Sequence, residues 1–468
     1  MIRVFSQYIS PKSFIRVIWE CGAIALALLC GTRIRFWNSA AGFDSYVTTP
    51  DFLTQAIAFV VVLQICFYYS DLYGMHMILR RQDQVILLAH SLGIGCLLLG
   101  ILYFVFPNLL IGRGVWFISV VLVGGFVMLS RVVLDRVWQA VVPKDNLVIL
   151  GTAGLALTVA RELSRRNDLT VHLTGFINPS NGPSDCGPSL LGRPILGEAE
   201  QLQSLVSYYA ISRIVVAIED LRKALPINDL VRLRVQGIRV EDAHSTIAAL
   251  TGRVWLETVK PSWFVFSDGF QRSLLTLLLK RLIDLLCGLA GLLLTSPLML
   301  LIAIAIRLES KGIVIFRQTR VGLRGKPFEL LKFRSMRTDA EQSGAVWASE
   351  NDPRVTRIGG FLRNYRLDEL PQFINIIRGQ MSFVGPRPER PVFVEQLRKD
   401  ISYYDERHSV RPGLTGWAQV QYKYGSSVED ARRKMEYDLF YLKNMSIPFD
   451  CAIIFRTIRI VLTGWGGR

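Results

Sequence analysis

The sequence predicts a membrane protein with a bundle of four transmembrane helices, a small Rossmann-like α/β domain and a more polar C-terminal domain. Of its 468 residues 51% are hydrophobic, and the mean hydropathy of +0.33 is too high for an ordinary soluble enzyme of this length. Four apolar segments, each close to the ~20 residues that a membrane-spanning helix needs, follow one another at the N-terminus. A strand–glycine–helix pattern typical of α/β domains comes next.

The four apolar segments lie at residues 14–31, 52–69, 85–106 and 115–134. The first contains an acidic residue, Glu20, and therefore matches the pattern least well. A signal peptide is not favoured, because three further segments follow without a clear cleavage site. Lysine and arginine are more frequent before the first segment, between the second and third, and after the fourth than in the two opposite loops. Because basic loops stay in the cytoplasm, we expect both ends of the bundle there.

Charge and cysteine content narrow the class of protein further. The formal net charge is +16 and the isoelectric point about 9.7, which suits an anionic membrane surface, phosphorylated substrates or nucleic acid. Nucleic acid is not expected as a partner, because no separate Lys/Arg-rich tail or zinc-finger spacing is present. The seven cysteines form no CxxC pair and the five histidines no HExxH motif, so we expect neither a disulfide framework nor a zinc site.

The α/β domain is predicted over residues 145–265. The stretch NLVILG at 146–151 is an apolar strand that ends in a glycine, and an amphipathic helix follows it. A second buried strand, RIVVAI, occupies 213–218. Alternation of strands and helices in a segment of this length favours a small doubly wound domain.

The glycine turn of this domain departs from the dinucleotide-binding fingerprint. Gly151 and Gly154 are present, but Ala153 and Ala156 stand where the second and third glycines of GxGxxG are needed. The acidic residue expected after the next strand is replaced by Asn178. A scaffold or regulatory role is therefore favoured over dinucleotide binding.

A fifth apolar segment spans residues 282–306 and is interrupted by Ser296-Pro297. It is long enough to cross a membrane, but proline removes a helix hydrogen bond and kinks the axis. Basic residues flank both ends, which fits a hairpin that enters and leaves on the cytoplasmic side. Composition alone leaves a transmembrane span and a re-entrant helix open.

The remaining residues, 308–468, are rich in Arg, Lys, Gly and Pro. Near their end the stretch IIFRTIRIVLTGW, residues 453–465, mixes apolar and basic positions. Such a helix lies in a membrane interface or forms part of the domain core, and the sequence leaves both open.

The stretch RLDELPQ, residues 366–372, places two carboxylates side by side. An apolar helix face follows, formed by Leu370, Phe373, Ile374 and Ile377. We therefore expect Asp368 at the N-cap of this helix, Pro371 in its first turn and Gly379 at its C-terminal stop. On this local pattern a capping role for Asp368 is favoured over a catalytic one, with Glu369 as its neighbour.

Cationic residues are dense on both sides of this pair. They are Lys332, Arg334, Arg363, Arg366, Arg387, Arg390 and Arg411. Each arginine alone would be a surface ion-pair partner, but several fixed guanidiniums and an ammonium around two carboxylates suit a diphosphate substrate. A phosphate-binding site and an ordinary charged surface remain open at this point.

Four motifs decide between these interpretations. KFRSM (332–336), LDELPQ (367–372), GQMSFVGPRP (379–388) and RPGLTGWAQV (411–420) occur in this order behind the Ser-Pro-interrupted segment. From about residue 275 to its end, the chain thereby resembles the bacterial sugar transferase family, the polyprenyl-phosphate phosphoglycosyl transferases of monotopic type. Residues 1–265 are similar, much less specifically, to the N-terminal region of the long members that initiate exopolysaccharide synthesis.

The resemblance implies that a sugar 1-phosphate passes from a UDP-sugar to undecaprenyl phosphate, with release of UMP. The acidic dyad of the family falls on Asp368 and Glu369. Asp368 would be the nucleophile that forms an aspartyl-phosphosugar, with Mg²⁺ held near the two carboxylates. Glu369 would bind the metal, orient a group or handle a proton, and these roles stay open. A helix N-terminus favours anions, so the cap position and catalysis are compatible.

The resemblance also implies a mainly α-helical catalytic domain over residues 275–468. Its helix at 282–306, broken at Ser296-Pro297, would be re-entrant and would hold the domain among membrane lipids on the cytoplasmic face of the bacterial inner membrane. Substrate phosphates would be bound by Lys332, Arg334, Arg366, Arg387 and Arg411. Asp438, in YDLFYLKN, would join the site or serve as a structural helix residue, and a homodimer through the N-terminal region is compatible with the pattern.

Two other functions fit the sequence less well. A membrane-tethered nucleotide-sugar epimerase or dehydratase would need an intact glycine fingerprint and a YxxxK pair near a Rossmann strand. The YxxxK pair of this chain, Tyr8 and Lys12, precedes the first apolar segment. A non-catalytic scaffold of a polysaccharide assembly complex would not need every core motif, yet all of them are present.

Overall fold

The computed structural model describes residues 2–4, 7–9, 11–70, 72, 81–141, 145–165, 171–179, 189–218, 225–257, 259, 261–267, 269–270, 272–337, 340, 352–422, 425 and 427–463. The chain divides into two compact units, which meet in the sequence between Ala243 and His244. The first unit contains the N-terminal helices and a sheet domain. The second contains the residues that carry the four motifs.

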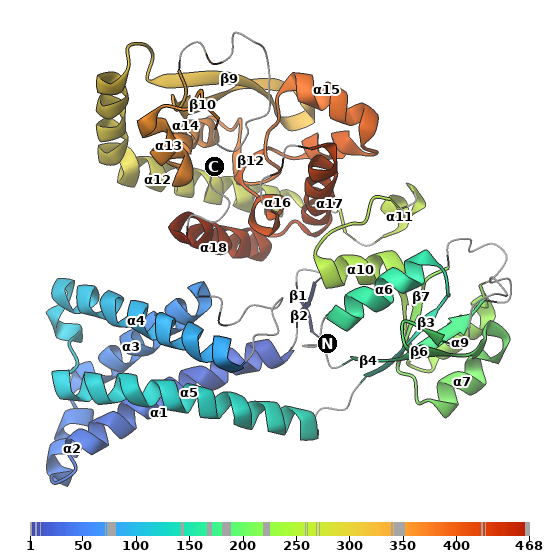
Figure 1. The fold of residues 1–468 in the computed structure, drawn as a ribbon, viewed down its shortest axis with the longest axis horizontal. Helices are drawn as coiled ribbons and strands as arrows, with labels where there is room; N and C mark the ends of the chain where they lie inside the picture. The colour runs from blue at the N-terminus through green and yellow to red at the C-terminus, as the bar shows by residue number, and fades with distance from the viewer. Residues whose placement is uncertain are drawn as a thin grey trace. The chain divides into compact units, whose positions relative to one another are not determined.

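The N-terminal part of the first unit consists of long helices, shown in blue and cyan in Figure 1. They are α1 (Pro11–Arg35), α3 (Pro50–Tyr69), α4 (Arg81–Val105) and α5 (Arg113–Val141), with the short α2 (Ala40–Val47) and η1 (Pro107–Leu109) between them and the strands β1 (Ile2–Val4) and β2 (Gln7–Ile9) before them. One apolar core joins the four long helices. Each is long and apolar enough to cross a membrane, by length and composition. A long helix forms at each of the four predicted segments, but the helices extend beyond the segments, by as many as seven residues at the end of α5.

Helices α1 and α5 pack along each other and share two ion pairs. The Arg131 Nε lies 2.7 Å from Oε1 of Glu20, and both side chains are buried. One turn away, Arg16 and Asp135 approach to 3.3 Å at a more exposed position. Glu20, the acidic residue of the first predicted segment, is therefore neutralised by Arg131 of α5.

The α/β part of the first unit is a sheet in the order β5-β6-β4-β3-β7-β8. Its elements are β3 (Asp145–Leu150), α6 (Gly154–Arg165), β4 (Val171–Asn178), β5 (Ser189–Leu190), β6 (Arg193–Glu198), η2 (Ala199–Gln201), α7 (Leu202–Tyr208), β7 (Arg213–Val216), α9 (Ile227–Val235) and β8 (Arg239–Asp242). All neighbours pair in parallel except β5 with β6, and the order reverses at β3. Gly151 ends β3 with φ +136°, and a Cβ there would lie 2.4 Å from the Ala217 carbonyl oxygen, so packing requires this glycine.

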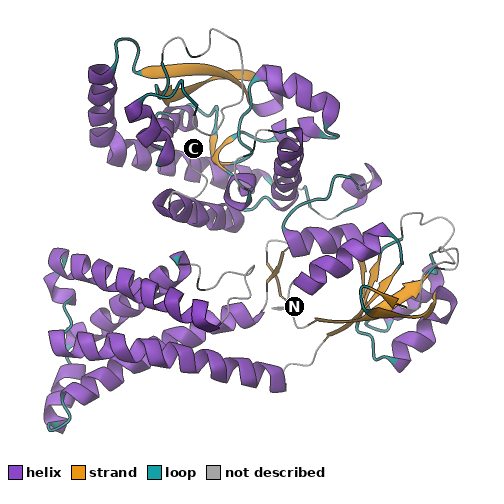
Figure 2. Ribbon diagram, in the orientation of Figure 1, coloured by secondary structure: helices purple, strands orange, loops and turns teal. Residues whose placement is uncertain are grey.

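The second unit is mainly helical, as Figure 2 shows. Its helices are α10 (Ala243–Thr251), α11 (Pro261–Phe266), α12 (Leu274–Glu309), α13 (Arg357–Asn364), α14 (Gln372–Ile377), α15 (Pro391–Asp400), α16 (Trp417–Gln421), α17 (Val428–Asn444) and α18 (Ile447–Thr463), with 3₁₀ turns η3 (Leu323–Gly325), η4 (Leu367–Glu369) and η5 (Tyr404–Ser409). Its strands form two pairs, antiparallel β9 (Ile315–Val321) with β10 (Pro327–Phe333) and parallel β11 (Ser382–Val384) with β12 (Gly413–Thr415).

The second unit begins earlier than the sequence predicted. Residues 244–265, which we expected in the α/β domain, pack with the C-terminal unit instead. Ala248, Val254 and Leu256 are buried in the same core as Trp417 and Leu439. A change from strands to helices does not mark this boundary, because α10 directly continues the β–α alternation of the sheet.

Helix α12 contains Pro297 and bends along its course, as the yellow ribbon of Figure 1 shows. Before the bend, Gly288 and Gly291 lie against α14, and after it Ile302 and Ile306 pack in a cluster with Phe333. At the bend, the leucines are largely exposed: Leu293, Leu294, Leu300 and Leu301. A proline has no backbone N–H for the helix hydrogen bond, and its presence therefore explains a kink in α12.

Helix α18 combines the two alternatives that the sequence left open. Phe449 and Ile453 are buried in the core of the second unit, while Phe455 and Ile458 are exposed on the same helix. One face thus belongs to the domain core and the other offers apolar side chains to the surroundings.

Candidate active site

Asp368 and Glu369 lie in the 3₁₀ turn η4, directly before α14, and both are buried. The prediction that Asp368 caps a helix is wrong: α14 begins at Gln372, and Pro371 holds its N-cap position without a side-chain cap bond. The proline has no N–H to donate to Leu367, so the turn closes by a tighter bond from the Leu370 N–H. Gly379 lies beyond the end of α14 with φ +78°, as predicted for a C-terminal stop.

Glu369 is held by two cations from elements distant in the sequence. The Arg387 Nη2 donates a 2.6 Å hydrogen bond to its Oε1, and the Lys332 ammonium lies 4.0 Å from the same oxygen. Burial raises the pKa of Glu369, but Arg387, Lys332 and Arg366 outweigh burial and lower this pKa to about 2. Glu369 is therefore a fixed anion across the neutral pH range.

Asp368 is in the opposite situation. Among the residues that the structure describes, no hydrogen bond or ion pair within 4.0 Å engages its carboxylate, although its surface is mostly covered. Burial raises the pKa of Asp368 to about 6; Lys332 opposes this rise and the charge of Glu369 adds to it. The group is thus mostly ionised at pH 7 and keeps its lone pairs available for a reacting atom.

Asn375 of α14 fixes the strand that carries Lys332. Its Oδ1 accepts a 3.0 Å hydrogen bond from the Leu331 N–H, and its Nδ2 donates to the Glu329 carbonyl oxygen at 2.7 Å. This fully buried side chain ties β10 to the helix that follows the acidic pair. The strand thereby places the ammonium of Lys332 beside Glu369 of η4.

Arg387 is fixed from the other side by a glycine-lined turn and a second arginine. β11 and β12 approach so closely that a Cβ on Gly413 would lie 2.1 Å from the Gly385 backbone nitrogen. The Arg407 Nη2 donates to the Arg387 carbonyl oxygen at 3.0 Å and to Oδ2 of Asp438 at 2.9 Å. Both Arg407 and Asp438 are buried, so they support the backbone from which Arg387 reaches Glu369.

The predicted phosphate-binding residues do not all meet at the carboxylates. Lys332 and Arg387 contact Glu369, and Arg366 lies close enough to act on its charge. Arg334 instead donates to the Ser310 and Lys311 carbonyl oxygens, beyond the end of α12. Arg411 donates to the Gly379 carbonyl oxygen and so closes the end of α14.

Sequence reasoning missed Arg407 and left Asp438 undecided. Arg407 lies in the 3₁₀ turn η5, twenty residues from Arg387, whose carbonyl oxygen it bonds. No spacing in the sequence relates it to Asp438, because the two meet only when η5 packs on α17. The charged stretch DERH, residues 405–408, was the local signal.

The two carboxylates fit a magnesium ion that is shared with a substrate. Within the described residues, no group of three or more His, Cys, Asp or Glu side chains could enclose a metal. Mg²⁺ is commonly bound by one or two carboxylates together with substrate phosphates and water. Asp368 and the second oxygen of Glu369 match that mode, and a closed protein cage does not.

Comparison with known proteins places this site in a family. The sequence pattern of the bacterial sugar transferase family matches residues 275–464. Over 196 residues the chain is 42% identical to the exopolysaccharide production protein PSS of Rhizobium leguminosarum bv. phaseoli, a match that covers 96% of that protein and 40% of this chain. The chain belongs to the bacterial sugar transferase family. The family match includes α12, the acidic pair and all four motifs.

Two longer relatives of this bacterial sugar transferase carry enzyme names. Over 239 residues the chain is 43% identical to UDP-N-acetylgalactosamine-undecaprenyl-phosphate N-acetylgalactosaminephosphotransferase of Aeromonas hydrophila, covering 51% of this chain and 56% of the relative. Over 183 residues it is 48% identical to UDP-glucose:undecaprenyl-phosphate glucose-1-phosphate transferase of Escherichia coli K12, covering 39% of each. The chain thus spans roughly half or less of these relatives.

Proposed function

We propose that this protein transfers a sugar 1-phosphate from a UDP-sugar to undecaprenyl phosphate. The products are UMP and undecaprenyl-diphosphate-sugar, and the step begins the synthesis of an exopolysaccharide or another surface glycan at the membrane. The observation that carries the proposal is the difference between the two carboxylates: no described residue makes a hydrogen bond or ion pair to Asp368, whereas Arg387 and Lys332 neutralise the charge of Glu369. Family membership supports the same reaction.

In the first step, a carboxylate oxygen of Asp368 attacks the phosphorus that bears the sugar. A new carboxylate–phosphorus bond forms, and the bond from this phosphorus to the bridging oxygen breaks. UMP leaves with that oxygen and its electron pair. The cations around Glu369 lower the repulsion between an attacking anion and a diphosphate, which otherwise makes such an attack slow. The covalent intermediate divides one transfer between two bulky substrates into two steps.

In the second step, a phosphate oxygen of undecaprenyl phosphate attacks the same phosphorus. The acyl-phosphate bond to Asp368 breaks, the carboxylate is regenerated, and the lipid diphosphate carries the sugar. A Mg²⁺ ion held by Asp368 and Glu369 would neutralise charge on the transferred group. Glu369 stays an anion throughout, because Arg387 and Lys332 fix its charge state.

The proposal includes the place of the reaction. A helix α12 that enters and leaves on the cytoplasmic side would keep η4 at the inner leaflet of the bacterial inner membrane, where UDP-sugars are available and a lipid phosphate reaches the surface. The proline inside this helix, Pro297, and the exposed leucines near it support this arrangement. The four long N-terminal helices would cross the membrane completely.

The test is UMP release from purified protein with Mg²⁺, undecaprenyl phosphate and one of several UDP-sugars: glucose, galactose or N-acetylgalactosamine. Activity should require both substrates, and the preferred donor identifies the sugar. Asp368→Asn should abolish turnover, while the exposed Asp405→Asn retains it. A phosphosugar adduct on Asp368 should be detectable by mass spectrometry when the lipid is withheld. Full turnover by Asp368→Asn would remove this residue as the nucleophile.

A further inference from the structure

The second unit contains a segment that precedes the family match. The match begins at residue 275, whereas the unit begins at His244. Residues 251–257, here named the strap, run along α17 and make backbone contact with it. The Val254 N–H donates to the Glu436 carbonyl oxygen at 3.0 Å, and the Trp417 indole donates to the Gly252 carbonyl oxygen at 2.7 Å.

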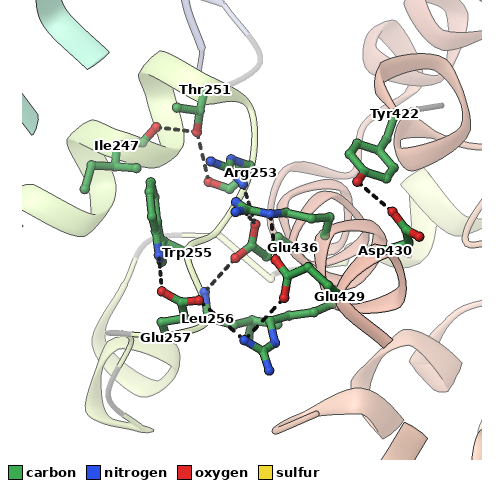
Figure 3. A network of polar contacts seen from close by, with 12 residues as sticks. Ile247, Thr251, Arg253, Trp255, Leu256, Glu257, Tyr422, Glu429, Asp430 and Glu436 are labelled. Atoms are coloured by element: carbon green, nitrogen blue, oxygen red, sulfur yellow. Dashed lines mark hydrogen bonds and ion pairs between the residues drawn. The ribbon is translucent and has the colours of Figure 1, made fainter. Parts of the chain in front are cut away.

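Glu436 of α17 is the polar centre of this contact, as Figure 3 shows. Its Oε2 accepts a 2.8 Å hydrogen bond from Nη1 of Arg253, and its Oε1 accepts one of 3.3 Å from the Leu256 N–H. The side chain of Glu436 is almost completely buried. The guanidiniums of Arg253 and Arg433 lie 4.7 and 5.9 Å from the centre of the Trp255 ring. A buried carboxylate of this kind is costly without its cation.

The opposite face of α17 supports the candidate active site. Residues two apart on an α-helix point about 200° from each other, so Glu436 and Asp438 serve different neighbours. Asp438 accepts the hydrogen bond from Arg407, and Arg407 donates to the Arg387 carbonyl oxygen. Arg387 in turn holds Glu369. One helix therefore joins the strap on one side to the acidic pair on the other.

We propose that the strap positions the active site: Arg253 and Glu436 fix α17 so that Asp438 and Arg407 present Arg387 to Glu369. Both are positioning residues, since neither touches the acidic pair. The inference rests on the proposed function and extends it upstream of the family match.

The charge of Glu436 depends on its partners, because the side chain is buried. Burial raises the pKa of Glu436 to about 7, and the charges of Glu257 and Glu429 add to this rise. Arg253 and the Leu256 N–H oppose it. Loss of Arg253 would leave Glu436 with the weaker, 3.6 Å contact to Arg433. The buried carboxylate would then take up a proton or pull α17 away from its place.

The experiment compares full-length wild type with Arg253→Met, Glu436→Gln and the conservative Arg253→Lys. UMP formation is followed with UDP-sugar in excess over the protein and without lipid, so that each active site reacts once. The amplitude then reports the fraction of active sites, and the rate constant reports how fast UMP forms at each of them. We expect Arg253→Met to lower the rate constant about 10- to 100-fold at an unchanged amplitude per folded protein, since a small misplacement at a site can cost this much. Arg253→Lys should recover part of the rate.

The control is Arg398→Met, which removes an exposed ion pair between Arg398 of α15 and Asp405 of η5 and should leave the rate constant unchanged. A lower amplitude with a wild-type rate constant in Arg253→Met would show a merely structural role and overturn the proposal. If Arg253→Met does not fold, Glu436→Gln and Arg253→Lys decide, and wild-type rate constants in both overturn it as well. Absence of UMP formation in the wild type would instead overturn the proposed function, and this inference with it.

Discussion

Arg387 donates a 2.6 Å hydrogen bond to Glu369, whereas no described residue makes such a bond to the adjacent Asp368. Two neighbouring carboxylates of the same chain are thereby given different properties. One has its pKa held at about 2 and the other has its pKa raised to about 6. A difference between paired acidic groups is what an enzyme needs when one must attack and the other must remain charged.

Arg387→Ala should lower the turnover number for UMP release about 10²–10³-fold, the usual cost of removing one donor that stabilises charge in a reaction. The substitution removes the main counter-charge of Glu369, so its pKa rises and the repulsion toward a diphosphate grows. Arg317→Ala is the matched control, because Arg317 forms an exposed pair with Glu329 on the β9–β10 hairpin. A loss in Arg387→Ala no larger than in Arg317→Ala would contradict this role.

The sequence motifs identified Asp368 and Glu369, but they did not show which side chains hold the two carboxylates in place. Lys332 and Arg387 each belong to a motif, and both meet Glu369. Arg334 belongs to the same motif as Lys332, yet it lies one residue beyond the end of β10 and bonds the turn after α12. Spacing predicted that cations gather, but strand ends and turn geometry decided which ones reach the carboxylates.

The predicted cap of Asp368 failed for a local reason, and the long helices succeeded for a general one. The pair winds into the 3₁₀ turn η4 and α14 begins only at Gln372, so the helix starts too late for Asp368 to be its cap. Apolar segments of spanning length carry one signal over many residues, and a long helix forms at each of the four predicted segments. Arg407 illustrates the limit, since its partners Asp438 and Arg387 come from distant elements.

His408 should make the stability of the protein depend on pH. Burial, with the charge of Arg407, lowers the pKa of His408 to about 4, although Asp405 opposes this change. In the unfolded chain the same imidazole binds a proton below about pH 6.5. Between these values the unfolded state holds more protons, so the free energy of unfolding should fall as the pH falls from 6.5 to 4, by up to about 3 kcal/mol.

The measurement is thermal unfolding in detergent over this pH range for the wild type and His408→Gln. The glutamine cannot take up the proton, so its unfolding temperature should change less between pH 6.5 and 4. The difference between the two proteins isolates His408 from the other groups that titrate in this range. Parallel curves for the two proteins would show that His408 does not contribute.

Both ends of α12 should be accessible from the cytoplasm if the helix is re-entrant. Leu274 and Lys311 flank the helix and are exposed, so each can be replaced by cysteine in a background from which the natural cysteines are removed. A membrane-impermeant maleimide should label both positions in inverted membrane vesicles and neither in intact spheroplasts. Asn38→Cys, in the loop after α1, should give the opposite result. Labelling of Leu274→Cys and Lys311→Cys from opposite sides would establish a complete span instead.

Replacing one partner of the buried Glu20–Arg131 pair should destabilise the protein far more than replacing both partners. Arg131→Gln leaves the carboxylate of Glu20 buried between helices without its main counter-charge, which costs about 3–5 kcal/mol in buried pairs. Glu20→Gln combined with Arg131→Gln removes both charges and should restore most of the lost stability. Asp135→Asn, one turn away on the same two helices, removes a more exposed pair and should cost less than about 1 kcal/mol.

A double-mutant cycle measured by unfolding in detergent micelles tests this directly, since it isolates the coupling between the two side chains. The expected coupling is several kcal/mol, because each single substitution leaves a buried charge without its main counter-charge. Additive effects of the two substitutions would mean that water or another residue compensates the remaining charge. In that event α1 and α5 would be held in register by their apolar contacts, with Leu28 and Val123 as the buried residues to test next.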